Sequence, residues 1–239
     1  MGVLLPLALA AAVSVASGQP AATIPALGKL VGAPSAIDPS VAVFKGIPYA
    51  RSPEGPLRWQ PPKAHPAWAP KTLNATQFGA MCTQSGYGAP KAGTAENCLF
   101  LNVQTPAAAL QAVSRGGESV AKLLPVMLWI HGGGYNTGAS NGYAGDNIVH
   151  QSGGSVVVVT INYRLNIFGF LGGKEIAAST AGGGSGNSGT ADGHACGAQP
   201  LTVCLRHLRH FTAFAVFLLY FYSIVRRCAG LRTFSANQF

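Results

Sequence analysis

A glycine-rich stretch near the middle of the chain, HGGGYNTGASNG at residues 131–142, contains two patterns that could act on an ester. Its first part, the HGGG of residues 131–134, follows an apolar run. Glycines at the end of a buried strand can turn their backbone N–H groups towards an oxyanion in a sheltered site. Its second part, the GASNG of residues 138–142, matches the G-x-S-x-G pattern of a serine nucleophile.

Ser140, the serine of this second pattern, does not stand where a nucleophile is expected. In a nucleophile elbow a buried strand leads into the serine and a helix leaves it. Ser140 instead comes six residues after Gly134, on the continuation of the same loop. From there its hydroxyl would have difficulty attacking a carbonyl whose oxygen rests on the N–H groups of that loop. We therefore predict that residues 138–142 form a polar surface loop and that Ser140 is not a nucleophile.

The surrounding residues predict the elements that position this loop. Residues 125–130 and 155–161 are apolar without alternation, which is typical of strands covered on both faces in a parallel sheet. Residues 41–44 and 99–103 predict two further strands, and residues 107–123 predict a helix that is weakened by a pair of glycines. Strands separated by loops and helical stretches indicate an α/β fold.

Five stretches of the chain, in this order, resemble the N-terminal part of the type-B carboxylesterases, the α/β-hydrolase family that includes cholinesterases and related lipases. They are FKGIPYARSPEGPLRWQPP (44–62), ENCLFLNV (96–103), LPVMLWIHGGGY (124–135), TINYRLNIFGFL (160–171) and GNSGTAD (186–192). The resemblance implies the N-terminal portion of an α/β-hydrolase fold with an incomplete central sheet. It also implies a family activity, the hydrolysis of small-molecule carboxylic esters through a serine acyl-enzyme, that needs no cofactor.

The resemblance assigns roles to two glycines and two cysteines. Family members use the second and third glycines of the HGGG loop as oxyanion donors, here Gly133 and Gly134. They also form a disulfide that corresponds to Cys82–Cys98, which would close a loop worth ~3 kcal/mol on the chain-entropy model. Choline-binding members place a tryptophan in this disulfide loop, where its ring holds a quaternary ammonium. The loop has no tryptophan here, so we expect a general carboxylester hydrolase ancestry rather than a cholinesterase.

The resemblance also implies two ion pairs. The arginine of PLRW pairs with the glutamate of ENC in the family, here Arg58 with Glu96. The arginine of NYR meets the aspartate of GNSGTAD, here Arg164 with Asp192. Without that resemblance, each pair would read as two solvated charges with little net effect on stability.

The resemblance stops abruptly after Asp192. The family continues there with Gln-Arg and an amphipathic helix, and its nucleophile motif, G-E-S-A-G, would fall near Tyr220. This chain instead reads GHACGAQP from Gly193 onwards, and FAVFLLYFYSIV around Tyr220. We expect residues 41–192 to be the family-like domain and residues 193–239 to be an unrelated tail, as a frameshift or a retained intron would produce.

This departure bears on activity, because no serine, acid or histidine of the chain stands in the contexts of the family's catalytic triad. We therefore expect the chain as given to be an inactive relative of the serine carboxylesterases. A non-catalytic, cholinesterase-like binding or adhesion module is the alternative, and a non-functional translation product is a third possibility. Without a strand to carry the nucleophile, residues 125–131 would form an exposed apolar edge of the sheet, which favours aggregation.

The N-terminal residues predict secretion. Residues 1–18 form a short apolar run followed by small residues, which is the form of a signal peptide. Residues 19–40 are rich in Ala, Pro and Gly, and they predict a linker or a loosely held arm. Asn74-Ala75-Thr76 is an acceptor sequence for N-glycosylation. We therefore expect a secreted, extracellular glycoprotein.

Charge and hydropathy limit the partners. The net charge is +9, but no short run is rich in Lys and Arg, so we expect no nucleic-acid partner. Residues 211–225 are apolar and flanked by arginines, but they are shorter than the ~20 residues of a membrane-spanning helix. The length therefore disfavours a membrane anchor at residues 211–225, which stays the alternative for this run. The sequence implies no metal and no cofactor, and it indicates no oligomeric state.

Overall fold

The computed structural model describes residues 18–24, 27–86, 89–90, 92–114, 124–179 and 186–198. Within these residues the largest sheet has five strands, in the order β11-β12-β10-β4-β3. β11 and β12 run parallel, and the other neighbouring strands of this sheet are antiparallel. The bounds are Val126–Ile130 for β11, Val157–Ile161 for β12, Phe100–Pro106 for β10, Val41–Pro48 for β4 and Ala33–Pro34 for β3.

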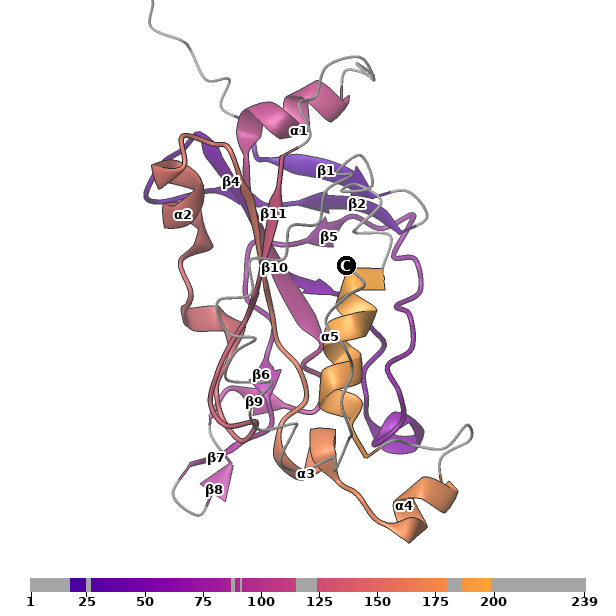
Figure 1. Ribbon diagram of the computed structural model, residues 1–239. Helices are drawn as coiled ribbons and strands as arrows, with labels where there is room; N and C mark the ends of the chain where they lie inside the picture. The colour runs from indigo at the N-terminus through magenta and orange to yellow at the C-terminus, as the bar shows by residue number, and fades with distance from the viewer. Residues whose placement is uncertain are drawn as a thin grey trace, which may run out of the picture.

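β12 lies at the centre of the core. All of its residues are buried, and successive side chains point to opposite faces of the sheet. Val158 packs in a small cluster with Val149 of helix α2 (Gly145–Gln151), while Val159 belongs to the main core on the other face. Figure 1 shows α2 on one side of the sheet and helix α5 (Ser188–Ala198) on the other. The prediction of a strand covered on both faces is confirmed here, although the sheet is mixed rather than parallel.

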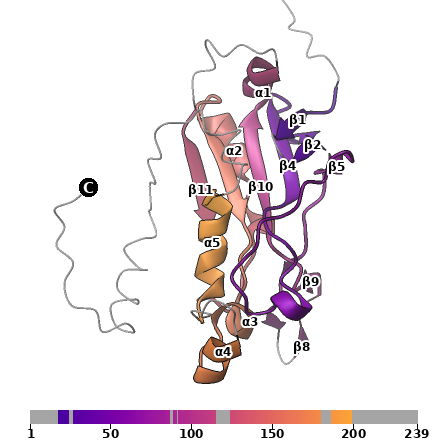
Figure 2. The same cartoon turned by 90° about the vertical axis from the view of Figure 1, so that its right-hand side faces the viewer.

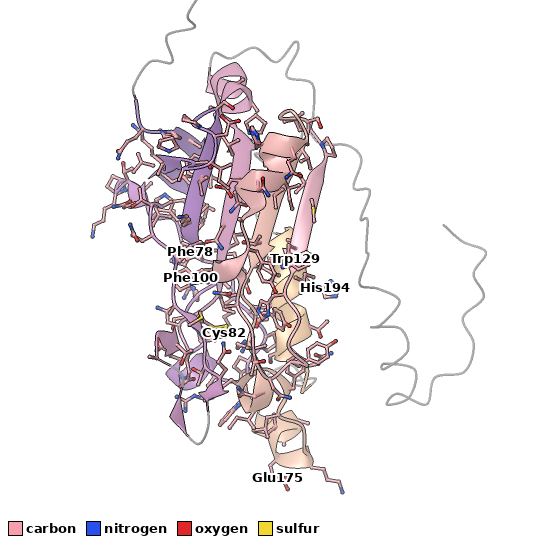
Figure 3. The ribbon with its side chains drawn as sticks, turned by 90° about the vertical axis from the view of Figure 1, so that its left-hand side faces the viewer. Phe78, Cys82, Phe100, Trp129, Glu175 and His194 are labelled. Carbon is pink, nitrogen blue, oxygen red and sulfur yellow. A yellow bond between two sulfur atoms is a disulfide. The ribbon has the colours of Figure 1, made fainter. Side chains whose placement is uncertain are left out.

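β11 is the outermost strand of this sheet within the described residues (Figure 2). Because it has a neighbour on one side only, most of its side chains are half-buried, and Ile130 is 49% exposed. The indole of Trp129 packs on the ring of Tyr143 with centroids 4.9 Å apart (Trp129 is labelled in Figure 3). The predicted strand is therefore present, but it is not covered like β12, and an apolar edge is exposed.

The prediction of a linker over residues 19–40 is wrong. These residues contain β1 (Ala21–Ile24) and β2 (Gly28–Val31), which form a small sheet with β5 (Leu73–Asn74), and then β3. The strands were missed because Ala, Pro and Gly dominate the composition here, although apolar side chains stand at alternate positions. Two of these side chains, Ile24 and Leu30, are buried in the main core.

The remaining elements are short. Helix α1 (Ala107–Ser114) starts where the helix of residues 107–123 was predicted, and residues 115–123 lie outside the described part. α5 crosses the expected domain boundary after Asp192, so Gly193 lies within a helix. The other elements are η1 (Gly55–Leu57), β6 (Met81–Cys82), β7 (Ser85–Gly86), β8 (Ala89–Pro90), β9 (Thr94–Ala95), η2 (Ser140–Gly142), α3 (Asn166–Phe170) and α4 (Lys174–Ser179).

Three predictions fall mostly or wholly outside the described residues: the signal peptide of residues 1–18, the apolar run of residues 211–225, and most of the tail of residues 193–239. Within the described ranges, no helix combines the length and the apolar character that crossing a bilayer requires.

A disulfide joins Cys82 of β6 to Cys98, as the family resemblance implied (Cys82 is labelled in Figure 3). Both residues are buried, and their Cα atoms are 4.8 Å apart. The bond ties β6 to the residues just before β10. Cys196 is the free cysteine of the described residues, and burial raises the pKa of its thiol to about 12.

The two ion pairs are present but differ in burial. Arg164 and Asp192 are almost fully buried, with side-chain exposures of 3% and 0%. The Arg164 guanidinium donates to both carboxylate oxygens at 2.9 and 2.7 Å, and the Arg164 backbone N–H donates to one of them at 3.0 Å. Burial raises the pKa of the Asp192 carboxyl, and these hydrogen bonds oppose that shift. Arg58 and Glu96 form a two-point pair at 2.6 Å, but Arg58 is 38% exposed.

We predict that Asp192→Asn lowers the free energy of unfolding by ~3–5 kcal/mol, because it leaves the buried Arg164 charge without its counter-ion. Urea denaturation of the purified chain measures this loss. Glu96→Gln is the matched control and should cost much less, since water and salt screen the exposed Arg58. Equal losses in the two variants would show that the buried pair has no special role.

Candidate functional site

The loop that follows β11 has a backbone that only glycine adopts easily. Gly133 and Gly134 have φ angles of 126° and 61°, in the left-handed region that side chains disfavour. A Cβ atom on Gly133 would lie 2.0 Å from the carbonyl oxygen of Thr137, so no larger residue fits there. Both glycines are exposed, so a ligand can reach their backbone.

The carbonyl group of Gly133 and the two glycine N–H groups have different roles. The carbonyl oxygen accepts hydrogen bonds from the N–H groups of Asn136 and Thr137, each at 3.1 Å, and it therefore closes a tight turn. The N–H groups of Gly133 and Gly134 donate no hydrogen bond to any described residue. Two adjacent, unpaired N–H groups at the end of a strand can bind a negatively charged oxygen.

The start of this loop is held by Tyr163. Its hydroxyl donates to the carbonyl oxygen of His131 at 2.8 Å, and its ring stacks on the His131 imidazole with centroids 4.5 Å apart. Burial lowers the pKa of His131 and raises the pKa of Tyr163 to about 12. At neutral pH the imidazole is therefore uncharged, and the phenol keeps the proton that it donates.

The end of the loop is held at Ser140, which is 1% exposed. Its N–H donates to Asn162 Oδ1 at 2.7 Å, and its Oγ accepts from Asn102 Nδ2 at 3.0 Å. The prediction of a surface loop is thus wrong for Ser140, because polar side chains from β10 and from the end of β12 reach up to bury it.

The contacts of Ser140 support a structural role. Within the described residues, no serine hydroxyl hydrogen-bonds a histidine ring, so Ser140 has no base to activate it. That Ser140 is not a nucleophile remains a prediction. Within the same ranges, no three His, Cys, Asp or Glu side chains gather as metal ligands would.

The other predicted site residues lie apart from the loop. The disulfide and the two ion pairs fasten neighbouring segments, as described above, and do not supply groups to the loop of residues 131–140. Asn74 is exposed, and its Oδ1 accepts from the N–H and the hydroxyl of Thr76 at 3.2 and 2.8 Å.

Sequence reasoning missed the residues that hold the loop: Asn102, Asn162 and Tyr163. A signal was present, because Asn102 interrupts the apolar strand of residues 99–103, and the other two directly follow a buried strand. A polar side chain inside such a strand must find a hydrogen-bond partner, so it marks a contact that the fold depends on.

The chain matches known proteins over most of the described part. The model of the carboxylesterase family matches residues 19–196. The fumonisin B1 esterase of Sphingopyxis macrogoltabida is 39% identical over 149 residues, which is 60% of this chain and 25% of that protein. The para-nitrobenzyl esterase of Bacillus subtilis (strain 168) is 37% identical over 130 residues, which is 52% of this chain and 24% of that protein. The chain thus spans about a quarter of the length of these relatives.

Solved structures agree with these matches. The crystal structure of EstA from Aspergillus niger superposes on the chain with a TM-score of 0.60 and 28% identity. That superposition covers 74% of this chain and 31% of EstA.

We predict that Ser140→Ala lowers the free energy of unfolding by ~1–3 kcal/mol, because it leaves a buried N–H of Asn102 without an acceptor. Urea denaturation again measures the change. Ser155→Ala, at an exposed serine, is the control and should stay within about 0.5 kcal/mol of the wild type. If Ser140→Ala is as stable as this control, the Ser140 hydroxyl contributes nothing measurable to the free energy of unfolding.

Proposed function

Because the chain belongs to the carboxylesterase family, whose model matches residues 19–196, we propose that residues 131–134 form the oxyanion hole of a serine esterase. The substrates are small-molecule carboxylic esters. One observation carries the proposal: the N–H groups of Gly133 and Gly134 are exposed and bond to no described residue, while both ends of their loop are tied to the core.

The chemistry of the proposed site follows from the position of these donors. The carbonyl oxygen of an ester accepts hydrogen bonds from the Gly133 and Gly134 N–H groups. When a serine hydroxyl attacks the carbonyl carbon, negative charge builds up on that oxygen. The two N–H groups bind the charged oxygen more strongly than the neutral one, and they therefore lower the barrier. Because Tyr163, Asn102 and Asn162 already hold the loop, no reorganisation is needed at the moment of reaction.

We further propose that the 239 residues on their own do not hydrolyse esters. Ser140 is buried and bonded to asparagines, and no other serine of the chain stands in the family's nucleophile motif. An oxyanion hole alone binds the developing charge but supplies no attacking atom. The non-catalytic binding module of the sequence analysis remains the competing function, and it shares this lack of turnover.

A chimera tests the oxyanion assignment. Residues 19–192 replace the matching N-terminal part of the para-nitrobenzyl esterase of B. subtilis, which supplies the rest of the catalytic site. We predict that the chimera hydrolyses p-nitrobenzyl esters. Gly133→Ala should lower kcat by ~10²–10³, because its Cβ atom collides with the Thr137 carbonyl oxygen and moves the N–H of residue 133 away from the oxyanion. Gly132→Ala is the matched control, because a Cβ atom there meets nothing within 4 Å.

Two results would contradict the proposed function. Equal kcat values for the two glycine variants of the chimera would remove Gly133 from the oxyanion hole. Labelling of the unfused 239-residue chain by a fluorophosphonate at Ser140 would show that the chain holds its own nucleophile. Saturable binding of a protein partner, with no fluorophosphonate labelling of the chain and an inactive chimera, would favour the binding module.

We also propose that the protein is secreted and that Asn74 carries an N-linked glycan. The Cys82–Cys98 disulfide supports an oxidising compartment, since such bonds are rare in the cytosol. The exposure of Asn74, together with its bonds to Thr76, presents the amide at the surface.

In a secretory eukaryotic host, we predict that the chain is recovered from the medium, starting after Ala16 or Gly18. Its mass should fall after treatment with peptide N-glycosidase. Asn74→Gln should remove that mass shift and leave secretion in place. Retention of the unglycosylated chain in the cytosol, with an intact N-terminus, would refute both parts.

A further inference from the structure

The side chain of Gln84 holds the peptide backbone of the oxyanion loop. Gln84 is 2% exposed and lies two residues after Cys82. Its Nε2 donates to the carbonyl oxygen of Gly138 at 2.8 Å, and its Oε1 accepts from the Gly138 N–H at 3.0 Å. The same Nε2 donates to the carbonyl oxygen of Cys82 at 3.1 Å. A single buried amide therefore satisfies both polar backbone groups of Gly138.

Gly138 is in turn packed against the start of the loop. Its φ angle is 112°, and a Cβ atom there would lie 2.4 Å from both the carbonyl oxygen of Gly132 and Nδ1 of His131. Residue 138 also directly follows Thr137, whose N–H bonds to the Gly133 carbonyl. The loop thus closes on itself, and the position of Gly138 limits where Gly133 and Gly134 can lie.

A second link joins the same two segments. The side-chain amide of Asn166 donates to the carbonyl oxygen of Thr83 at 2.8 Å, and the Asn166 N–H donates to that of Tyr135 at 2.7 Å. The segment 82–84 is itself fixed by the disulfide and by the bond from the Thr83 N–H to the Ala95 carbonyl at 3.1 Å. The segment is therefore linked to the oxyanion loop twice, directly through Gln84 and indirectly through Asn166.

We propose that Gln84 is a positioning residue for the oxyanion site: it transfers the fixed position of the disulfide-anchored segment 82–84 to Gly133 and Gly134. This inference deepens the proposed function and rests on it for its catalytic meaning. Preorganised donors stabilise an oxyanion without reorganisation, and a shift of about 1 Å can cost 10²-fold in rate. A side chain that never touches the substrate thus sets the strength of the site.

Nuclear magnetic resonance of the 239-residue chain tests the proposal without any need for activity. Gln84→Met keeps the length of the side chain and removes its three hydrogen bonds. We expect the Gly138 N–H to exchange with solvent ~10–100-fold faster, since the two half-buried backbone groups of Gly138 lose their partners. We also expect the ¹⁵N order parameters of Gly133 and Gly134 to fall from about 0.85 towards 0.6, with shifted amide signals.

Gln151→Met is the matched control, because Gln151 lies exposed on α2 and bonds only locally, to Asn147. It should leave the loop glycines unchanged. The amide signals of Gly46 and Gly153 report on folding elsewhere in the chain. If Gln84→Met does not fold, Asn166→Gly gives the second test: glycine tolerates the positive φ of 46° at that position, and the variant loses the side-chain bonds of Asn166 to the Thr83 carbonyl oxygen and from the Phe168 N–H. Asn166→Gly should lower the ¹⁵N order parameters of Tyr135 and Gly134, but by less than Gln84→Met lowers those of the loop glycines.

The outcomes separate this inference from the proposed function. Faster exchange at Gly138 with unmoved signals and order parameters at Gly133 and Gly134 would show that Gln84 only secures the disulfide loop, and would overturn the inference. An unchanged loop in a folded Asn166→Gly variant would do the same. Because neither readout uses an ester, an inactive chimera would refute the oxyanion function while leaving the coupling of Gln84 to the loop measurable.

Discussion

Three consecutive residues after the most buried strand, Asn162, Tyr163 and Arg164, fasten the glycine-rich loop and helix α5 to the sheet. Asn162 holds the far end of the loop of residues 131–140 at Ser140, Tyr163 holds its start at His131, and Arg164 holds α5 through Asp192. All three are less than 5% exposed. Each satisfies polar groups that would otherwise be buried without a partner, so the site and the last described helix depend on where β12 ends.

This arrangement explains why a loop so rich in glycine is well defined. Glycines cost conformational entropy when they are ordered, and the exposed turn of residues 132–134 buries little apolar surface to offset it. The order comes instead from directional bonds at the two ends of the loop and at Tyr135. The loop therefore keeps two N–H groups free of partners in the described part while the neighbouring carbonyls are engaged. These two N–H groups are thus available to an acceptor, as the proposed oxyanion function requires.

The sequence predicted what is carried by local pattern or by recognisable motifs. The strands β11 and β12 follow from uninterrupted apolar runs, and the disulfide and the ion pairs follow from the family resemblance. The strands within residues 19–40 were missed, because alanine and proline diluted the alternation that buries Ile24 and Leu30. The burial of Ser140 and the contacts of Gln84 were missed for a different reason. They join residues that are 22 to 54 positions apart in the chain, and no local period encodes such a pairing.

The order of strands in the main sheet has a consequence for folding while the chain is being synthesised on the ribosome. β10 sits between β4, which precedes it by more than fifty residues, and β12, which follows it by a similar distance. β11 is synthesised before β12 but can join the sheet only beside it. Contacts between such distant residues form slowly, because a long loop must close, at a cost in chain entropy, before any hydrogen bond forms to offset that cost. β11 must therefore stay without a neighbouring strand until the residues of β12 emerge, and an unpaired apolar strand of this kind favours aggregation of the nascent chain during that interval.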